Sequence, residues 1–111
     1  MAGMMTPPPG DAVFKALSDP TRREILSLLR ERRRSVGEIA SNFRVSRPAI
    51  SKHIRLLRDA GLVVDRTAGT AGRVCELNAV PLRAVDDWLD AYKKHWSRGL
   101  ARLKTLVEED R

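Results

Sequence analysis

The sequence is poor in the residues that build covalent frameworks and membrane spans. It contains one cysteine among 111 residues, so no disulfide can form within the chain. No apolar run approaches the roughly 20 residues that a membrane-spanning helix needs, or the core of a signal peptide. These absences suit the reducing cytosol, and we expect a cytoplasmic protein.

The patterns that accompany catalysis are missing as well. No nucleophile is paired with a base, no Gly-rich phosphate loop follows a predicted strand, and no two carboxylates share an apolar setting. We therefore expect neither enzymatic activity nor a cofactor.

Acidic residues are outnumbered, with 14 Asp and Glu against 21 Lys and Arg, for a formal net charge of +7. Before Leu82 there are 14 basic and 8 acidic residues, whereas the remainder is nearly balanced with 7 and 6. A basic portion of this kind favours a polyanionic partner, either nucleic acid or an anionic membrane surface. The length suffices for one domain with one modest core.

The first part of the chain divides into a leader and two helices. Residues 1–10 hold three prolines, two glycines and no charge, so we expect a disordered leader followed by one domain, residues 11–111. A helix is predicted over Asp11–Leu17. Another begins at Asp19 and Pro20, which supply a capping side chain and a proline at the first helical position.

The stretch from Ser35 to Leu62 predicts two short helices joined by a turn. Ser35 and Glu38 fit a capping box at the start of the first helix. Its buried face is predicted from positions i, i+3, i+4 and i+7, which are Val36, Ile39, Ala40 and Phe43. The next two residues leave room only for a turn.

The second helix has clear start and stop signals. Ser46 can cap it, and Pro48 fits the first turn, where the missing N–H costs nothing. Its inner stripe is predicted to hold Ile50, Ile54 and Leu57. Gly61 suits the left-handed residue that ends a helix.

The outer face of this second helix carries donors and positive charge. Its members are Arg47, Ser51, Lys52, Arg55 and Arg58, with no carboxylate before Asp59. A helix with such a face can enter the DNA major groove and reach base edges from its N-terminal residues. Arg47 and Lys52 are the strongest candidates for base contacts.

A hairpin is predicted after this helix. Leu62–Thr67 and Arg73–Leu77 have the composition of strands, and Ala68–Gly72 is a flexible turn between them. Arg66 and Arg73 flank the tip, where they can hold phosphates or reach the minor groove.

The last predicted element is a long helix over residues 79–108, which Asn78 caps. Its apolar positions keep helical spacing over about 26 residues, or about 39 Å, which outreaches so small a domain. Part of the apolar stripe therefore needs another partner, and we expect a homodimer. The predicted interface comprises Val13, Phe14, Leu17, Val85, Trp88, Leu89, Tyr92, Trp96, Leu100 and Leu103, although some aromatic residues are expected to close the protomer's own core.

Two segments carry a family resemblance. Ser46 to Val63 resembles the recognition helix of the ArsR/SmtB family of bacterial winged-helix repressors, and Ala16 to Leu26 resembles that family's first two helices. The likeness spans roughly Asp11 to Leu77. It implies a mainly α fold with a small β-hairpin (α+β), a winged helix-turn-helix of order α-α-α-α-β-β-α that dimerises through its terminal helices. The residues predicted to bind double-stranded DNA are Arg44, Ser46, Arg47, Pro48, Ser51, Lys52, His53, Arg55, Arg58, Arg66 and Arg73.

Many members of this family sense metals, so their ligand patterns are compared with this sequence. One family site is a Cys-x-Cys pair near the first helix of the reading unit, and residues 35–43 contain no cysteine. Another pairs Asp-x-His with His-x-x-Glu on the final helix, a spacing that Asp86, Asp87, Asp90 and His95 do not match. We predict no recognised metal site, while a new site shared between subunits remains open.

The resemblance leads to one main hypothesis and two alternatives. The main one is a homodimeric repressor that binds an inverted-repeat operator and regulates its own promoter. One alternative is a derepressor of the same family that responds to a metal or small molecule. The other is a basic module that binds an acidic protein or RNA.

Overall fold

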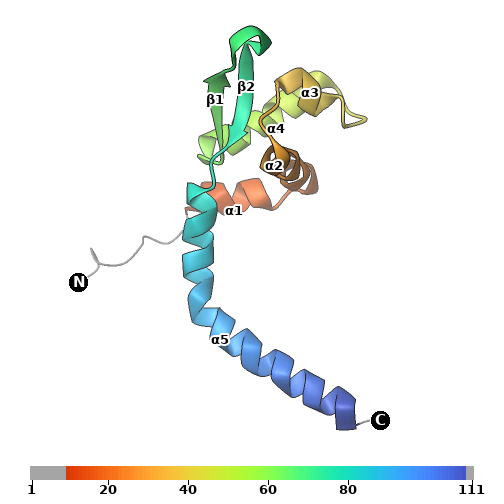
Figure 1. Cartoon of the computed structure of the whole chain (residues 1–111), viewed down its shortest axis with the longest axis vertical. Coiled ribbons are helices and arrows are strands. Elements are labelled where there is room, and N and C mark those ends of the chain that lie inside the picture. The colour runs from red at the N-terminus through yellow and green to blue at the C-terminus, as the bar shows by residue number, and fades with distance from the viewer. Residues whose placement is uncertain (1–9, 110–111) are drawn as a thin grey trace, which may run out of the picture.

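The computed structural model describes residues 10–109, which form helices and one two-stranded hairpin (Figure 1). The elements are α1 (Asp11–Leu17), α2 (Pro20–Glu31), α3 (Val36–Ala40), α4 (Arg47–Asp59), β1 (Val63–Thr67), the short 3-10 helix η2 (Gly69–Ala71), β2 (Arg73–Leu77) and α5 (Val80–Glu109). This order confirms the predicted fold class. The predicted leader, residues 1–10, lies outside the described residues except for Gly10.

Local capping explains where three of the helices begin. The Asp19 carboxylate accepts from the backbone N–H of Arg22 at 3.0 Å and starts α2. Ser35 and Glu38 form the predicted capping box, with reciprocal hydrogen bonds of 3.1 and 3.3 Å. The Ser46 hydroxyl caps α4 at 3.3 Å. These side chains satisfy N–H groups that a helix leaves unpaired at its first turn.

The first helix of the reading unit is shorter than predicted, because α3 ends at Ala40 and Phe43 lies in the following turn. The Ser41 hydroxyl and the Asn42 amide both donate to the Glu38 carbonyl, at 2.7 and 2.9 Å. Such local bonds offer the backbone an alternative to continuing the helix. Phe43 still packs against the core, so the apolar spacing indicated its burial but not its secondary structure.

The core lies where α2, α3 and α4 meet the base of the hairpin. Its largest fully buried side chains are Ile25, Ile39, Ile50, Ile54, Leu57, Leu62, Val63 and Cys75. The predicted inner stripe of α4 is therefore confirmed. Burial of that stripe fixes the rotation of α4 about its own axis, so its polar side faces outward.

The hairpin pairs Val63 with Leu77 at its base and Thr67 with Arg73 at its tip. A second anchor holds β2 from outside, because Arg34 and Cys75 exchange backbone hydrogen bonds of 3.1 and 2.7 Å. Gly72, at the tip, has a positive φ that other residues rarely adopt. The tip thus projects beyond a middle pair whose β2 strand is fastened to the segment after α2.

Helix α5 begins at Val80, one residue later than predicted, and continues to Glu109. Asn78 accepts from the Val80 N–H at 3.3 Å and donates to the Gly61 carbonyl at 2.8 Å, which joins the start of α5 to the end of α4. The helix then runs away from the body, so the hairpin and the end of α5 lie at opposite ends of the molecule (Figure 1). All side chains of residues 94–108 are exposed. Among the described helices, none is apolar enough over a sufficient length to cross a bilayer.

Candidate nucleic-acid interface

The outer side of α4 presents the predicted polar set to solvent. Arg47, Ser51, Lys52, Arg55 and Arg58 are all exposed, opposite the buried stripe. Pro48, in the first turn of α4, and Arg44 and Ser46, before the helix, are exposed as well. The structure therefore brings nine of the eleven predicted DNA-binding residues, all but the two in the hairpin, onto α4 and the turn before it.

Arg47 occupies the first position of α4 and lies against the start of α3. A Cβ placed on Gly37 would lie 3.8 Å from Arg47 Nη1, which is ordinary van der Waals contact, so the guanidinium lies beside Gly37 of α3. Among the interactions formed within residues 10–109, no ion pair engages Arg47, Lys52 or Arg55. Their charges are available to an incoming anion.

A basic groove separates the reading unit from the hairpin. Its lining consists of Ser35, Val36, Gly37, Arg47, Arg58, Asp65, Arg73, Val74 and Cys75. Three arginines and one aspartate make the groove net positive, which suits the phosphate backbone of DNA.

Asp65 is a site residue that the sequence did not reveal. Its two carboxylate oxygens accept from Arg58 at 3.0 Å and from Arg73 at 2.7 Å, so it links the end of α4 to the hairpin. Arg66 lies 3.8 Å from Glu76 on the paired strand. The signal for this link is available only once the strand register is known, because Asp65 faces Cys75, two residues from Arg73.

His53 is partly buried, unlike the other predicted DNA-binding residues of α4. Its side chain is 25% exposed, and its Nδ1 lies 3.2 Å from Nη1 of Arg22 on α2. Arg22 also escaped the sequence prediction, although it lies three, four and seven residues before the buried Ile25, Leu26 and Leu29. A charged residue at that spacing on a buried face is the signal that could have identified it.

No three metal-ligating side chains converge within the described part of the chain. Cys75 is buried, and this burial raises the pKa of its thiol above the usual value. The neutral thiol acts here as a small core side chain, and a thiolate would be needed to bind a metal.

The predicted dimer surface is largely, but not entirely, exposed. Phe14 of α1 packs edge-on against Trp88 of α5 at a centroid distance of 5.6 Å, and Trp88 contacts Tyr92 at 5.4 Å. These three rings are 39–48% exposed. We revise the prediction for Val13, which is 8% exposed and belongs to the protomer's own core.

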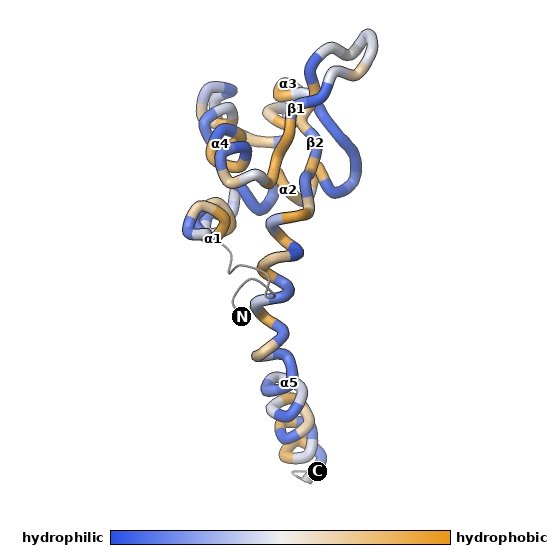
Figure 2. Tube along the Cα trace, turned by 90° about the vertical axis from the view of Figure 1, so that its left-hand side faces the viewer, coloured by the Kyte–Doolittle hydropathy of each residue, from blue (hydrophilic) through white to orange (hydrophobic). Residues whose placement is uncertain are grey.

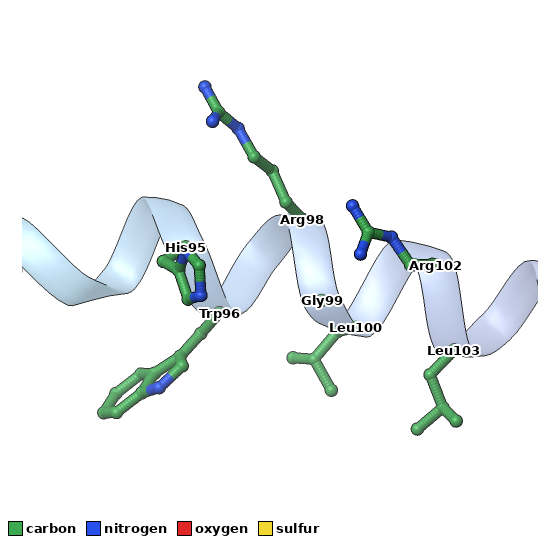
Figure 3. Close-up of a pocket in the computed structure, with 7 residues that line it drawn as sticks. All are labelled: His95, Trp96, Arg98, Gly99, Leu100, Arg102 and Leu103. Atoms are coloured by element: carbon green, nitrogen blue, oxygen red, sulfur yellow. The ribbon is translucent and has the colours of Figure 1, made fainter.

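The remaining predicted interface residues differ in burial along α5. Leu17 and Val85 pack partly against the core and Leu89 is partly buried, whereas Trp96, Leu100 and Leu103 are exposed. Figure 3 shows these last three on one side of α5, while Arg98 and Arg102 point away on the other. Apolar and polar residues alternate along α5 in Figure 2. Around residues 96–103 the apolar ones gather on one side of the helix and form an apolar stripe.

Comparisons with known proteins agree with this architecture. The family model described as "Bacterial regulatory protein, arsR family" matches residues 19–64. The HTH-type transcriptional regulator Rv2034 of Mycobacterium tuberculosis (strain ATCC 25618 / H37Rv) is 40% identical over 100 residues, which cover 90% of each chain. The transcriptional repressor SdpR of Bacillus subtilis (strain 168) is 47% identical over 57 residues, covering 51% of this chain and 63% of SdpR.

Solved structures show the same fold. An ArsR-like transcriptional regulator from Rhodococcus sp. RHA1 superposes with a TM-score of 0.66 at 35% identity, over 86% of this chain and 89% of that one. The DNA-binding domain of Mb0332 from Mycobacterium bovis, described as a homodimeric winged helix-turn-helix, has a TM-score of 0.57 at 27% identity, over 75% and 78% of the two chains.

Proposed function

The chain belongs to the arsR family of bacterial regulatory proteins, and from this premise we propose that it is a homodimeric repressor that binds an inverted-repeat operator. Members of this family are transcriptional regulators rather than enzymes, and the chain has their winged helix-turn-helix fold. The observation that carries the proposal is the outer side of α4, where exposed cations lie opposite the buried stripe. The name of SdpR as a repressor supports the direction of regulation.

In this proposal α4 enters the major groove and reads bases with its N-terminal half. Arg47 and Lys52 contact base edges, since an arginine can pair with guanine through two hydrogen bonds. The other proposed contacts, to phosphates or adjacent bases, are Arg44, Ser46, Pro48, Ser51, Arg55, Arg58, Arg66 and Arg73. The hairpin arginines reach the backbone beside the major groove, or the minor groove.

Dimerisation places two such helices on one duplex. We propose that the surface formed by α5 and the exposed ring of Phe14 packs against the same surface of a second copy. The domain that dimerises comprises residues 11–111. The support is the apolar stripe of α5, which residues 94–108 extend past the body with every side chain exposed. The description of Mb0332 as homodimeric is consistent with this arrangement. Two-fold symmetry of the protein would match an inverted repeat with half-sites about one helical turn, or a multiple, apart.

Repression would follow from occupying a promoter and excluding polymerase. We propose that the protein acts in the cytoplasm and that its own promoter is among the targets. Neither a metal nor a cofactor is part of the proposal.

Selection of bound sequences from random duplex DNA tests the proposal directly. We expect enrichment of one inverted repeat, a dimer by light scattering, and steep loss of affinity with added salt because Lys and Arg displace counterions from phosphates. A scrambled duplex of equal length and composition is the matched control. A monomer that binds every duplex equally would contradict the proposal, and a preference for RNA or an acidic protein would favour the basic-module alternative.

A further inference from the structure

Arg22 is the one charged side chain that the described residues bury, with 8% of its surface exposed. Its side-chain hydrogen bonds run to other elements. Nε donates to the Ala16 carbonyl at 2.9 Å, Nη2 donates to the Lys15 carbonyl at 2.8 Å, and Nη1 lies 3.2 Å from His53 Nδ1. A buried guanidinium is tolerated because these bonds replace its lost hydration.

The two carbonyls belong to the last turn of α1, where carbonyl groups lack partners inside the helix. The backbone N–H and hydroxyl of Ser18 also donate to the Lys15 carbonyl, at 3.3 and 2.7 Å. Arg22, from its place on α2, thus helps to close the end of α1. Helix α1 also carries Phe14, which packs on Trp88 of α5. One guanidinium thus joins the helix at the proposed dimer surface to the helix that reads DNA.

The bond to His53 defines the state of the imidazole. A guanidinium has donors only, so Nδ1 must accept and the ring proton must reside on Nε2. His53 is therefore neutral while the bond exists. The Asp19 carboxylate lies 3.9 Å from the same Nδ1, beyond hydrogen-bond reach, and already accepts from the Arg22 backbone N–H.

The charged groups that the structure places at His53 are thus Arg22 and Asp19, from α2 and its cap. Two acidic side chains on other elements packed against α4 have partners elsewhere. Glu38 of α3 pairs with Arg32, and Asp65 of β1 pairs with Arg58 and Arg73. From α1 the contact is made by backbone carbonyls through Arg22. A proton on Nδ1 would abolish the Arg22 bond and leave Asp19 as the available acceptor.

We propose that Arg22 is a positioning residue for DNA recognition: held by the last carbonyls of α1, it sets the orientation of α4 through the neutral imidazole of His53. This inference rests on the proposed DNA-binding function. It assigns His53 a role behind the reading surface, where it orients Ser51, Lys52 and Arg55 rather than supplying affinity itself.

A double-mutant cycle tests this role. Arg22→Met removes the donor, His53→Leu removes the acceptor, and His53→Asn keeps an acceptor near the position of Nδ1. Affinity for the selected operator and for a scrambled duplex is measured by fluorescence anisotropy over a range of salt concentrations. Thermal unfolding and light scattering show whether each variant remains folded and dimeric.

We expect Arg22→Met and His53→Leu each to lower the ratio of operator to scrambled affinity by about tenfold, the scale of one charge-assisted hydrogen bond. The salt dependence should not change, since no phosphate contact is lost. The double variant should be no worse than either single one, and His53→Asn should restore most of the ratio. Additive losses would overturn the proposal, because Arg22 is too buried to contact DNA and could then act only independently of His53.

Rescue by His53→Asn supplies a readout that a merely structural role would not move. If Arg22→Met does not fold, the two His53 variants decide the matter, and an equal loss of the affinity ratio in His53→Leu and His53→Asn overturns the proposal. A wild-type protein without any sequence preference would refute the proposed function instead, whereas an unchanged ratio in His53→Leu refutes the positioning role alone.

Discussion

Arg47 is the residue that we propose contributes most to base recognition. It is exposed at the first turn of α4, and its guanidinium lies over Gly37 of α3. Residues at the start of a recognition helix are those that reach base edges in the major groove. The side chain combines this position with a charge that no carboxylate of the described residues neutralises.

We predict that Arg47→Ala weakens operator binding by about 1–3 kcal/mol and relaxes sequence preference at one position of each half-site, because a bidentate contact to guanine is lost. The measurement is competitive binding across a library of single-base operator variants.

The matched control for Arg47 is Arg30→Ala, which removes an exposed arginine from the end of α2. It should leave the preference at every position unchanged. An Arg47→Ala profile identical to that of the unmodified protein would remove Arg47 from the base contacts.

Glu38 makes a pH-dependent contribution to stability through the capping box. The backbone N–H of Ser35, with help from the Arg32 guanidinium, holds the pKa of the Glu38 carboxyl below its usual value. A depressed pKa in the folded state means that the stabilisation is present above the unfolded pKa of about 4.3 and is lost as pH falls through the folded value.

We expect the Tm of the unmodified protein to fall more between about pH 6 and about pH 3 than that of Glu38→Gln, because glutamine keeps the capping hydrogen bond without titrating. The measurement is thermal unfolding followed by circular dichroism. Glu24→Gln, an exposed position on α2, is the control and should follow the unmodified protein. Parallel Tm curves for Glu38→Gln and the unmodified protein would contradict this assignment.

At the scale of elements, the hairpin and α4 act as one unit because Asp65 holds an arginine from each. The carboxylate fixes the direction of Arg58 and Arg73 and cancels part of their charge. The hairpin is therefore held at its middle pair, by the ion pairs of Asp65 on one strand and by the backbone bonds of Cys75 to Arg34 on the other.

We predict that Asp65→Asn strengthens binding to scrambled DNA and lowers the ratio of operator to scrambled affinity. The freed arginines can contact additional phosphates, so the salt dependence, log K against log salt, should steepen by about 1–2. Fluorescence anisotropy at several salt concentrations measures both effects.

Glu76→Gln serves as the comparison for Asp65, since Glu76 faces only Arg66 at a looser 3.8 Å. Its effect on the salt dependence should be smaller. Equal effects of the two substitutions would show that the link between α4 and the hairpin has no special role.

Element boundaries were predictable where the signal is local. The starts of α2, α3 and α4 follow from Asp19, Ser35 and Ser46, whose side chains accept from the backbone N–H three residues on. The end of α3 was not predictable, because the Ser41 and Asn42 side chains donate to the Glu38 carbonyl in place of a backbone N–H of a longer helix. The spacing of apolar residues gives no sign of these bonds.

At the scale of the whole molecule, the exposed apolar stripe of α5 requires a partner. Trp96, Leu100 and Leu103 are 53–67% exposed and lie on one side of the helix, beyond the reach of the protomer's own core (Figure 3). Large aromatic side chains in such surfaces carry much of the binding energy of an interface.

We predict that Trp96→Ala weakens the homodimer by about 2 kcal/mol, or about 30-fold in Kd, because each copy loses a large buried anchor. Sedimentation equilibrium measures the change. Arg98→Ala, on the opposite side of the same helix, should leave the Kd unaltered, and a dimer that tolerates both substitutions equally would place the interface elsewhere.

Features that depend on interactions between near neighbours in the chain were predictable from the sequence. These features are the helices, their caps, the hairpin and the cationic face of α4. What the tertiary structure decided are the contacts between distant segments: Arg22 with His53, Asp65 between Arg58 and Arg73, and Val13 in the core instead of on a free surface. The physical reason is that capping and amphipathic spacing act over one or two turns, whereas the partner of a buried charge or a strand carboxylate depends on how whole elements pack.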